Sequence, residues 1–447
     1  MTATQGRLTR AMVVAAVVLG LTASTASPVA GVTVLDLPAS QLRITLGRAL
    51  AEHAFLTIEA MRTGLEEGEA FGAAGEALEA NTVDVVGLIE TVYGEDAGSA
   101  FGELWRAHIA YVVDYTRGLA EGDEAATARA VDRLQQYTGD LADLLSGANP
   151  NLPRQAVVDL LEDHVAQLEH VASFAEDDYA TAYTAIRETY AHMFVIADGL
   201  AQAIVQQFPD RFPGQPVAFG PTVDLALALD RMLGEHALLA IMSTRAGLRE
   251  APDLEAAAAA LEANSAELTG AIAGIYGEPA GDQFGDLWRL HTGLYLDYVT
   301  ATREDDLPGR QAAADGLDDY RADFAAFLSS ANAELSAPAL EDVLELHTGH
   351  LLDQVDAFAD EDFSGGYQIT RDAYEHMAVI GGALATAIAK QFPDLFPDTA
   401  TLAEPSGALG EWGGLPVLGV GLLLIAVLWT TLTPMRRVQA DPMHRRR

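Results

Sequence analysis

The chain has 447 residues and no cysteine, and its 65 acidic residues against 26 basic ones give a formal net charge of −39. The lack of cysteine excludes disulfides, thiolate catalysis, iron–sulfur clusters and zinc–cysteine sites. A protein with this much negative charge repels nucleic acid and attracts cations and basic partners. A solvated surface suited to high salt would explain the same charge. No protein partner or oligomeric state can be named from this composition.

Residues 1–26 have the pattern of a secretory signal peptide. Arg7 and Arg10 precede an apolar run from Ala11 to Leu21, and small residues follow up to Ala26. The run is too short to be a membrane span, so we expect it to be removed on export.

The middle of the chain is an internal repeat. YGEDAGSAFGELWRAH at 93–108 and YGEPAGDQFGDLWRLH at 276–291 are separated by 183 residues and share eleven of sixteen positions. The phrases QFPDRFP and QFPDLFP end at Pro213 and Pro397, where proline stops a helix. We therefore predict two helical repeats, at 33–213 and 218–397, each long enough to have its own core.

Each repeat is expected to be all-α. Alanine, leucine and glutamate dominate, and apolar residues recur at intervals of three and four. Turn signals near Gly68, Gly94, Gly122, 149–153 and Asp177 divide the first repeat into six helices, and the second repeat is divided correspondingly. The fold predicted is two tandem six-helix up-down bundles, each made of three hairpins, followed by one C-terminal transmembrane helix.

The C-terminal region has the pattern of a membrane anchor. Residues 398–414 contain Pro405, Ser406 and several glycines, which is typical of a linker, and 415–433 form an uncharged apolar run long enough to span a bilayer. Arginines follow in the tail, 434–447, which predicts a cytoplasmic C-terminus. We expect a single-pass cell-membrane protein whose N-terminal region is extracellular.

The repeat also places histidines in a regular way. In each predicted hairpin, a histidine in the first helix and a polar residue in the second lie at nearly equal distances from the turn, which brings them to one height. The pairs are His53 with Asn81, His108 with Tyr137 and His164 with His192, then His236 with Asn264, His291 with Tyr320 and His347 with His376.

Four level histidines in one bundle suggest a metal or haem site. Imidazole binds copper, zinc and iron, so the predicted ligands are His53, His108, His164 and His192 in the first repeat and His236, His291, His347 and His376 in the second. The accessory residues predicted are Asn81, Tyr137, Glu188, Asn264, Tyr320 and Asp372. The alternative is a buried hydrogen-bond layer that fixes the register of the helices.

The sequence favours a non-enzymatic role. A ferritin-type di-iron site needs Glu-x-x-His pairs, and none of the eight histidines has a glutamate three residues earlier. No phosphate loop, GxSxG or HExxH motif occurs, so no catalytic residue is assigned.

The phrases ALEAN, YGE-x-AG, LWR-x-H, Y-x-HM and QFPD-x-F, which occur in both repeats, resemble a helical repeat of secreted and surface-anchored bacterial proteins. Those proteins often carry the label "copper amine oxidase N-terminal domain-containing". The resemblance covers both repeats and implies an exported helical module, with copper as a candidate metal. It implies no oxidase activity, because no oxidase core is present. The function predicted is metal or haem binding for storage, sensing or redox at the cell envelope, and the alternative is a structural or interaction spacer.

Overall fold

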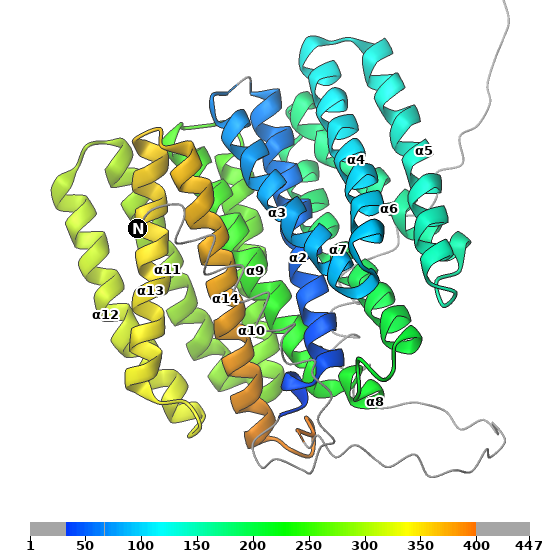
Figure 1. The fold of residues 1–447 in the computed structure, drawn as a ribbon. Helices are drawn as coiled ribbons and strands as arrows, with labels where there is room; N and C mark the ends of the chain where they lie inside the picture. The colour runs from blue at the N-terminus through cyan, green and yellow to red at the C-terminus, as the bar shows by residue number, and fades with distance from the viewer. Residues whose placement is uncertain (1–32, 67, 399–447) are drawn as a thin grey trace, which may run out of the picture. The chain divides into compact units, whose positions relative to one another are not determined.

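The computed structural model describes residues 33–66 and 68–398, and these ranges are helical with no strand, which confirms the predicted all-α class (Figure 1). The long helices of the first half are α2 (Pro38–Leu65), α3 (Ala70–Tyr93), α4 (Glu95–Glu121), α5 (Glu124–Ala148), α6 (Arg154–Val171) and α7 (Tyr179–Gln207). Those of the second half are α9 (Pro221–Leu248), α10 (Leu254–Tyr276), α11 (Glu278–Arg303), α12 (Leu307–Ala331), α13 (Ala337–Ala359) and α14 (Phe363–Gln391). The short elements are η1 (Val34–Asp36), η2 (Ala172–Glu176) and α8 (Gln215–Ala218).

The helix boundaries follow from local chemistry. Gly94 follows α3 with a φ of 91°, and Gly122 follows α4 with a φ of 66°, conformations that glycine adopts without steric cost. The carboxylates of Asp123, Asp178 and Asp362 accept hydrogen bonds from backbone N–H groups in the first turns of α5, α7 and α14. Single residues therefore define several of the helix boundaries.

The first helices of the two halves, α2 and α9, lie at the centre of the molecule. Helix α2 packs against α3, α4, α7 and α9, and α9 packs against α10, α11, α14 and α2. Both helices are buried along most of their length. In Figure 1, α5 and α6 lie toward one end of the arrangement and α12 and α13 toward the other. The described residues thus pack as one compact unit in which the halves meet through their central helices.

Two matching ion-pair clusters join the halves. Arg371 of α14 donates to Glu52 of α2 at 2.7 and 3.0 Å and to Asp84 of α3 at 2.7 Å. In the reverse direction, Arg187 of α7 donates to Glu235 of α9 at 3.0 and 3.2 Å and to a carboxylate on α10. Each half therefore supplies an arginine to a buried glutamate of the other half.

A third cluster lies deeper between the halves. Glu59 of α2 is fully buried and accepts hydrogen bonds from Arg245 of α9 and from the hydroxyl of Tyr367 on α14. Arg62 donates to Asp253 at 2.7 Å. Burial alone would raise the pKa of Glu59, but Arg245 and Arg62 outweigh burial and lower it. Glu59 is therefore held as a carboxylate within the core, which requires both halves to be in place.

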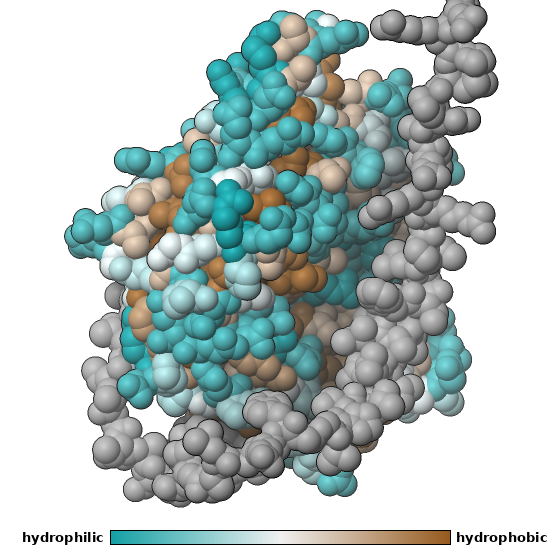
Figure 2. All heavy atoms as spheres, turned by 90° about the vertical axis from the view of Figure 1, so that its right-hand side faces the viewer, coloured by the Kyte–Doolittle hydropathy of each residue, from teal (hydrophilic) through white to brown (hydrophobic). Residues whose placement is uncertain are grey.

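The face of the molecule on the side of α5 and α6 is largely hydrophilic (Figure 2). Figure 2 views the molecule from the side of α5 and α6, where hydrophilic residues cover most of the visible face and hydrophobic ones lie between them. None of the helices in the described ranges combines the length and apolar character needed to cross a membrane. The predicted signal peptide, membrane span and tail, and the predicted linker after Asp398, lie outside the described residues.

Candidate metal centre

Three histidines of the second half converge in the core. His236 on α9, His291 on α11 and His347 on α13 are 1%, 1% and 4% exposed, and one ring nitrogen from each lies within 4.8 Å of the other two. The Nε2 atoms of His236 and His291 are 3.3 Å apart. These three imidazoles could hold a metal ion.

The first half has a looser version of the same arrangement. The Nε2 atoms of His53 on α2 and His108 on α4 are 3.1 Å apart, and both rings are buried. His164 on α6 is close enough to lower the pKa of both. Its side chain is partly exposed, although its Nδ1 is buried without a hydrogen-bond partner. Residues at corresponding positions therefore make corresponding contacts, but the third histidine is less enclosed.

Aromatic rings surround the paired histidines in both halves. Trp288 lies with its ring centroid 4.7 Å from His236 and 4.6 Å from His291, and Tyr320 stacks on His291 at 5.0 Å. Trp105 and Tyr137 take the same places around His53 and His108. The tyrosines stack on the imidazole faces and offer the ring nitrogens no hydrogen bond, so this packing buries the histidine pairs without satisfying their nitrogens.

The histidines are held neutral. Burial lowers the pKa of His236 to about 4 and that of His108 to about 3. Burial also lowers the pKa of His53, His291 and His347, and neighbouring histidines add to the shift because like charges repel. Neutral imidazole is the form that binds a metal, so at pH 7 no proton needs to leave before a metal is bound.

Buried ring nitrogens without partners remain around both sites. The Nδ1 atoms of His53 and His236 have no hydrogen-bond partner, and His347 has none at either nitrogen. A backbone acceptor at Trp105 raises the pKa of His108 against the effect of burial, and backbone acceptors at Trp288 and Leu287 do the same for His291. Leaving a buried polar atom unsatisfied costs about 1–3 kcal/mol, so native proteins rarely keep several together. These unpartnered nitrogens at one level of the bundle are potential metal-ligand atoms.

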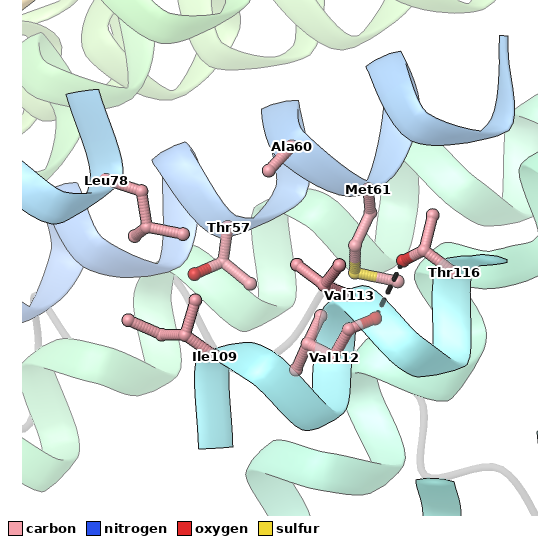
Figure 3. Close-up of a pocket in the computed structure, with 8 residues that line it drawn as sticks. All are labelled: Thr57, Ala60, Met61, Leu78, Ile109, Val112, Val113 and Thr116. Atoms are coloured by element: carbon pink, nitrogen blue, oxygen red, sulfur yellow. Dashed lines mark hydrogen bonds between the residues drawn. The ribbon is translucent and has the colours of Figure 1, made fainter. Parts of the chain in front are cut away.

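The layer below the histidines differs between the halves. In the first half, a cavity of about 10 Å³ lies one helical turn from His53 and His108, lined by the residues labelled in Figure 3, among them Thr57, Leu78 and Val112. This is room for about one water molecule. Tyr295 occupies the position of Val112 in the second half, and its hydroxyl contacts Thr244. A larger buried side chain therefore lies one helical turn from His291, where the first half has a valine one turn from His108.

The fourth predicted ligand of each half does not join the convergent group. His192 on α7 lies 3.0 Å through Nε2 from the backbone oxygen of Leu160, and His376 on α14 lies 2.9 Å from that of Val343. Because a carbonyl oxygen only accepts, Nε2 must carry the proton in both cases. The unprotonated Nδ1 is then the atom left to bind a ligand.

The predicted accessory residues have varied surroundings. Asn81 donates to Glu52 at 2.8 Å and Asn264 donates to Glu235 at 2.8 Å, so both belong to the ion-pair clusters between the halves. Tyr137 and Tyr320 stack on histidines as described. Glu188 is exposed on α7, and the carboxylate of Asp372 accepts from Gln368 at 2.9 Å.

The sequence analysis did not single out Glu52, Glu235 or His350. Each glutamate directly precedes a site histidine, and its signal was a charged residue inside an otherwise apolar stretch. His350 was missed because the repeat does not match it: Gln167 stands at the corresponding position of the first half.

The spacing of the paired imidazoles is compatible with a tetrahedral metal, and the third histidine of the second half has a nitrogen within 4.8 Å of the other two. Zinc–nitrogen bonds of ~2.0–2.1 Å imply ligand nitrogens roughly 3.3 Å apart, and the Nε2 separations of 3.1 and 3.3 Å are close to this. The same separations also fit a hydrogen bond between two imidazoles. Comparison of the chain with known protein families, curated proteins and solved structures finds no match.

Proposed function

We propose that this protein binds a divalent transition-metal ion in each half, through His236, His291 and His347 in the second half and His53, His108 and His164 in the first. The observation that supports this most strongly is the convergence of three buried, neutral imidazoles, two of which, His236 and His347, have ring nitrogens without partners. A layer built only for hydrogen bonding would pair those nitrogens with acceptors.

The ligand set favours zinc or copper. Imidazole nitrogen suits zinc, copper, iron and nickel, whereas calcium and magnesium prefer oxygen. Haem is disfavoured because aromatic rings already pack against the histidines and the nearby cavity holds about one water. Three histidines leave a fourth coordination position for water, and the cavity one helical turn from the first-half pair has room for about one water molecule. Storage or buffering of a metal therefore fits better than catalysis.

The two sites are expected to differ in affinity. The second half has its three ligands within 4.8 Å, with Tyr295 packed below them. In the first half, His164 is partly exposed and a cavity lies beside the histidine pair. A preorganised site loses less free energy on ordering its ligands, so the second half should bind more tightly.

The test is metal content and competitive zinc titration on protein purified without chelator or affinity metal. We expect about two equivalents of metal bound with unequal affinity, as one ion per three-histidine group requires. His291→Ala should remove the tighter site and His108→Ala the weaker one. His170→Ala is the control, because His170 is exposed and outside both groups. A protein that binds no metal, or His291→Ala with both sites intact, would leave the histidines as a structural layer.

We also propose that this binding takes place outside the cell, on a chain anchored by one C-terminal helix. The support is the signal-peptide pattern of 1–26, the apolar run of 415–433 and the charge of −39, which attracts cations. Protease treatment of intact cells tests this placement. The helical region should be degraded while a tag on the tail is protected, and protection of both would contradict it.

A further inference from the structure

A second group of histidines lies between the inner triad of the second half and the surface. Helix α13 carries His347, His350 and Asp353 at intervals of three residues, which places them along one stripe. His347 is buried, His350 is half-buried and Asp353 is exposed. The stripe therefore leads from the metal ligands of the core to solvent.

Next to this stripe of α13 lies His376 of helix α14. The ring of His376 lies 5.6 Å from that of His350, at an angle of 89°. Its Nε2 donates to the Val343 carbonyl, which leaves Nδ1 with a lone pair. The Nδ1 of His350 is buried and has no hydrogen-bond partner. Two imidazoles, each with an Nδ1 atom that could bind a metal, thus lie side by side at the edge of the core.

His347 connects the inner and outer groups. Its ring centroid is 6.2 Å from those of both His236 and His291. Its pKa is lowered by burial first, then by His236 on one side and by His376 and His350 on the other. Both of its nitrogens are buried and unpartnered, so one can face the inner group while the other faces the outer pair.

Acidic residues flank the outer pair. Asp372 lies one turn before His376 on α14, and Asp353 lies one turn after His350 on α13. Burial lowers the pKa of His350, and both aspartates act against this shift, which places their charges near its ring. Negative charge at this opening concentrates cations from solution.

We propose that His350 and His376 form an outer transition-metal site, which captures a cation at the surface and transfers it to His347 and the inner triad. This inference rests on the proposed function of the triad. The transfer is an exchange of ligands, in which each new imidazole–metal bond replaces an earlier one and no redox change occurs.

The first half provides a natural contrast. Gln167 and His170 stand where the second half has His350 and Asp353. His164 and His192 are nearly parallel, with centroids 6.4 Å apart. An amide is a poor ligand for these metals, so the first half has no outer pair.

The experiment measures the rate of Co²⁺ uptake by stopped-flow absorption, in a His108→Ala background that leaves only the second site. We expect His350→Gln, which copies the first half, to slow uptake by about tenfold while changing the equilibrium affinity of the triad much less. His170→Gln should leave the rate unchanged. In the wild-type background, Gln167→His should accelerate uptake by the first half.

Each outcome decides a different point. An unchanged rate in His350→Gln overturns the outer site but not the triad. If the His108→Ala protein binds no Co²⁺, the proposed function and this inference both fail. Because glutamine is the native residue at the equivalent position of the first half, His350→Gln is expected to fold, and circular dichroism verifies this.

Discussion

Removing the Arg371 guanidinium should destabilise the whole described region. Arg371 is 3% exposed and makes three charge-assisted hydrogen bonds of 2.7 to 3.0 Å across the boundary between the halves. Arg371→Met leaves Glu52 buried without its cation, and breaking a buried pair in this way costs about 3–5 kcal/mol. Asn81 would remain as a donor to Glu52 but carries no charge.

The expected change in melting temperature depends on whether the halves unfold together. Unfolding entropy is about 2.1 cal/mol/K per residue, so ~365 described residues give about 0.8 kcal/mol/K. The loss of 3–5 kcal/mol then lowers Tm by about 4–6 °C in a single transition. If one half unfolded alone, the shift would be about twice as large and a second transition would appear.

Differential scanning calorimetry measures both quantities. Arg106→Met is the matched control, because Arg106 bonds Glu79 within one half and its side chain is 46% exposed, so the loss should stay below about 1 kcal/mol. Adding Glu52→Gln to Arg371→Met should recover part of the stability, since the unpaired charge is removed. A Tm shift in Arg371→Met no larger than that of the control would refute the role assigned to this cluster.

Further predictions concern protonation, packing and metal. The metal-free protein should lose stability as pH falls from 6.5 toward 4, because histidines in the unfolded chain bind protons in this range and the buried histidines of the folded protein do not. With a pKa of about 4 for His236 in the folded protein and 6.5 in the unfolded chain, the free energy of unfolding should fall by about 2 kcal/mol at pH 5, which urea titration can measure. A flat profile between pH 7 and 5 would contradict the burial of neutral histidines. Gly234→Ala should lower the free energy of unfolding by about 1–3 kcal/mol, because the added methyl group would lie 2.7 Å from the ring of Tyr374. Gly293 has open space around it, so Gly293→Ala should be neutral or stabilising by up to about 1 kcal/mol in the same titration. Zinc at 100 times Kd should stabilise the protein by about 2.7 kcal/mol per site, which corresponds to a rise in Tm of roughly 3.5 °C. His291→Ala should abolish the part of this stabilisation that comes from zinc bound in the second half.

The helical class and the level of the histidines were predictable because both depend on local spacing. Equal distances from a turn bring the two members of each pair, such as His236 and Asn264, to one height, and side-by-side packing of the three hairpins brings His236, His291 and His347 level with one another. The direction of a side chain is not encoded in this way. Asn81 is level with His53 but bonds Glu52, because a buried carboxylate needs donors and the adjacent position on a helix points about 100° away.

Contacts between the halves could not be inferred from one repeat at a time. Glu59 and Arg245 are not at equivalent positions of the repeat, since the offset of 183 pairs Glu59 with Met242 and Arg62 with Arg245. Their ion pair exists only because α2 and α9 pack against each other. The pair of His350 and His376 could not be predicted from the repeat for a related reason, because the first half has Gln167 at the position of His350.

The most direct test of the metal site is a crystal structure of the zinc-loaded protein, with anomalous diffraction recorded on both sides of the zinc absorption edge. The account predicts an anomalous peak within ~2.0–2.1 Å of one nitrogen of each of His236, His291 and His347, and a weaker peak beside His53 and His108. Density that shows His236 and His291 hydrogen-bonded to each other, with zinc absent or only at surface carboxylates, would contradict it.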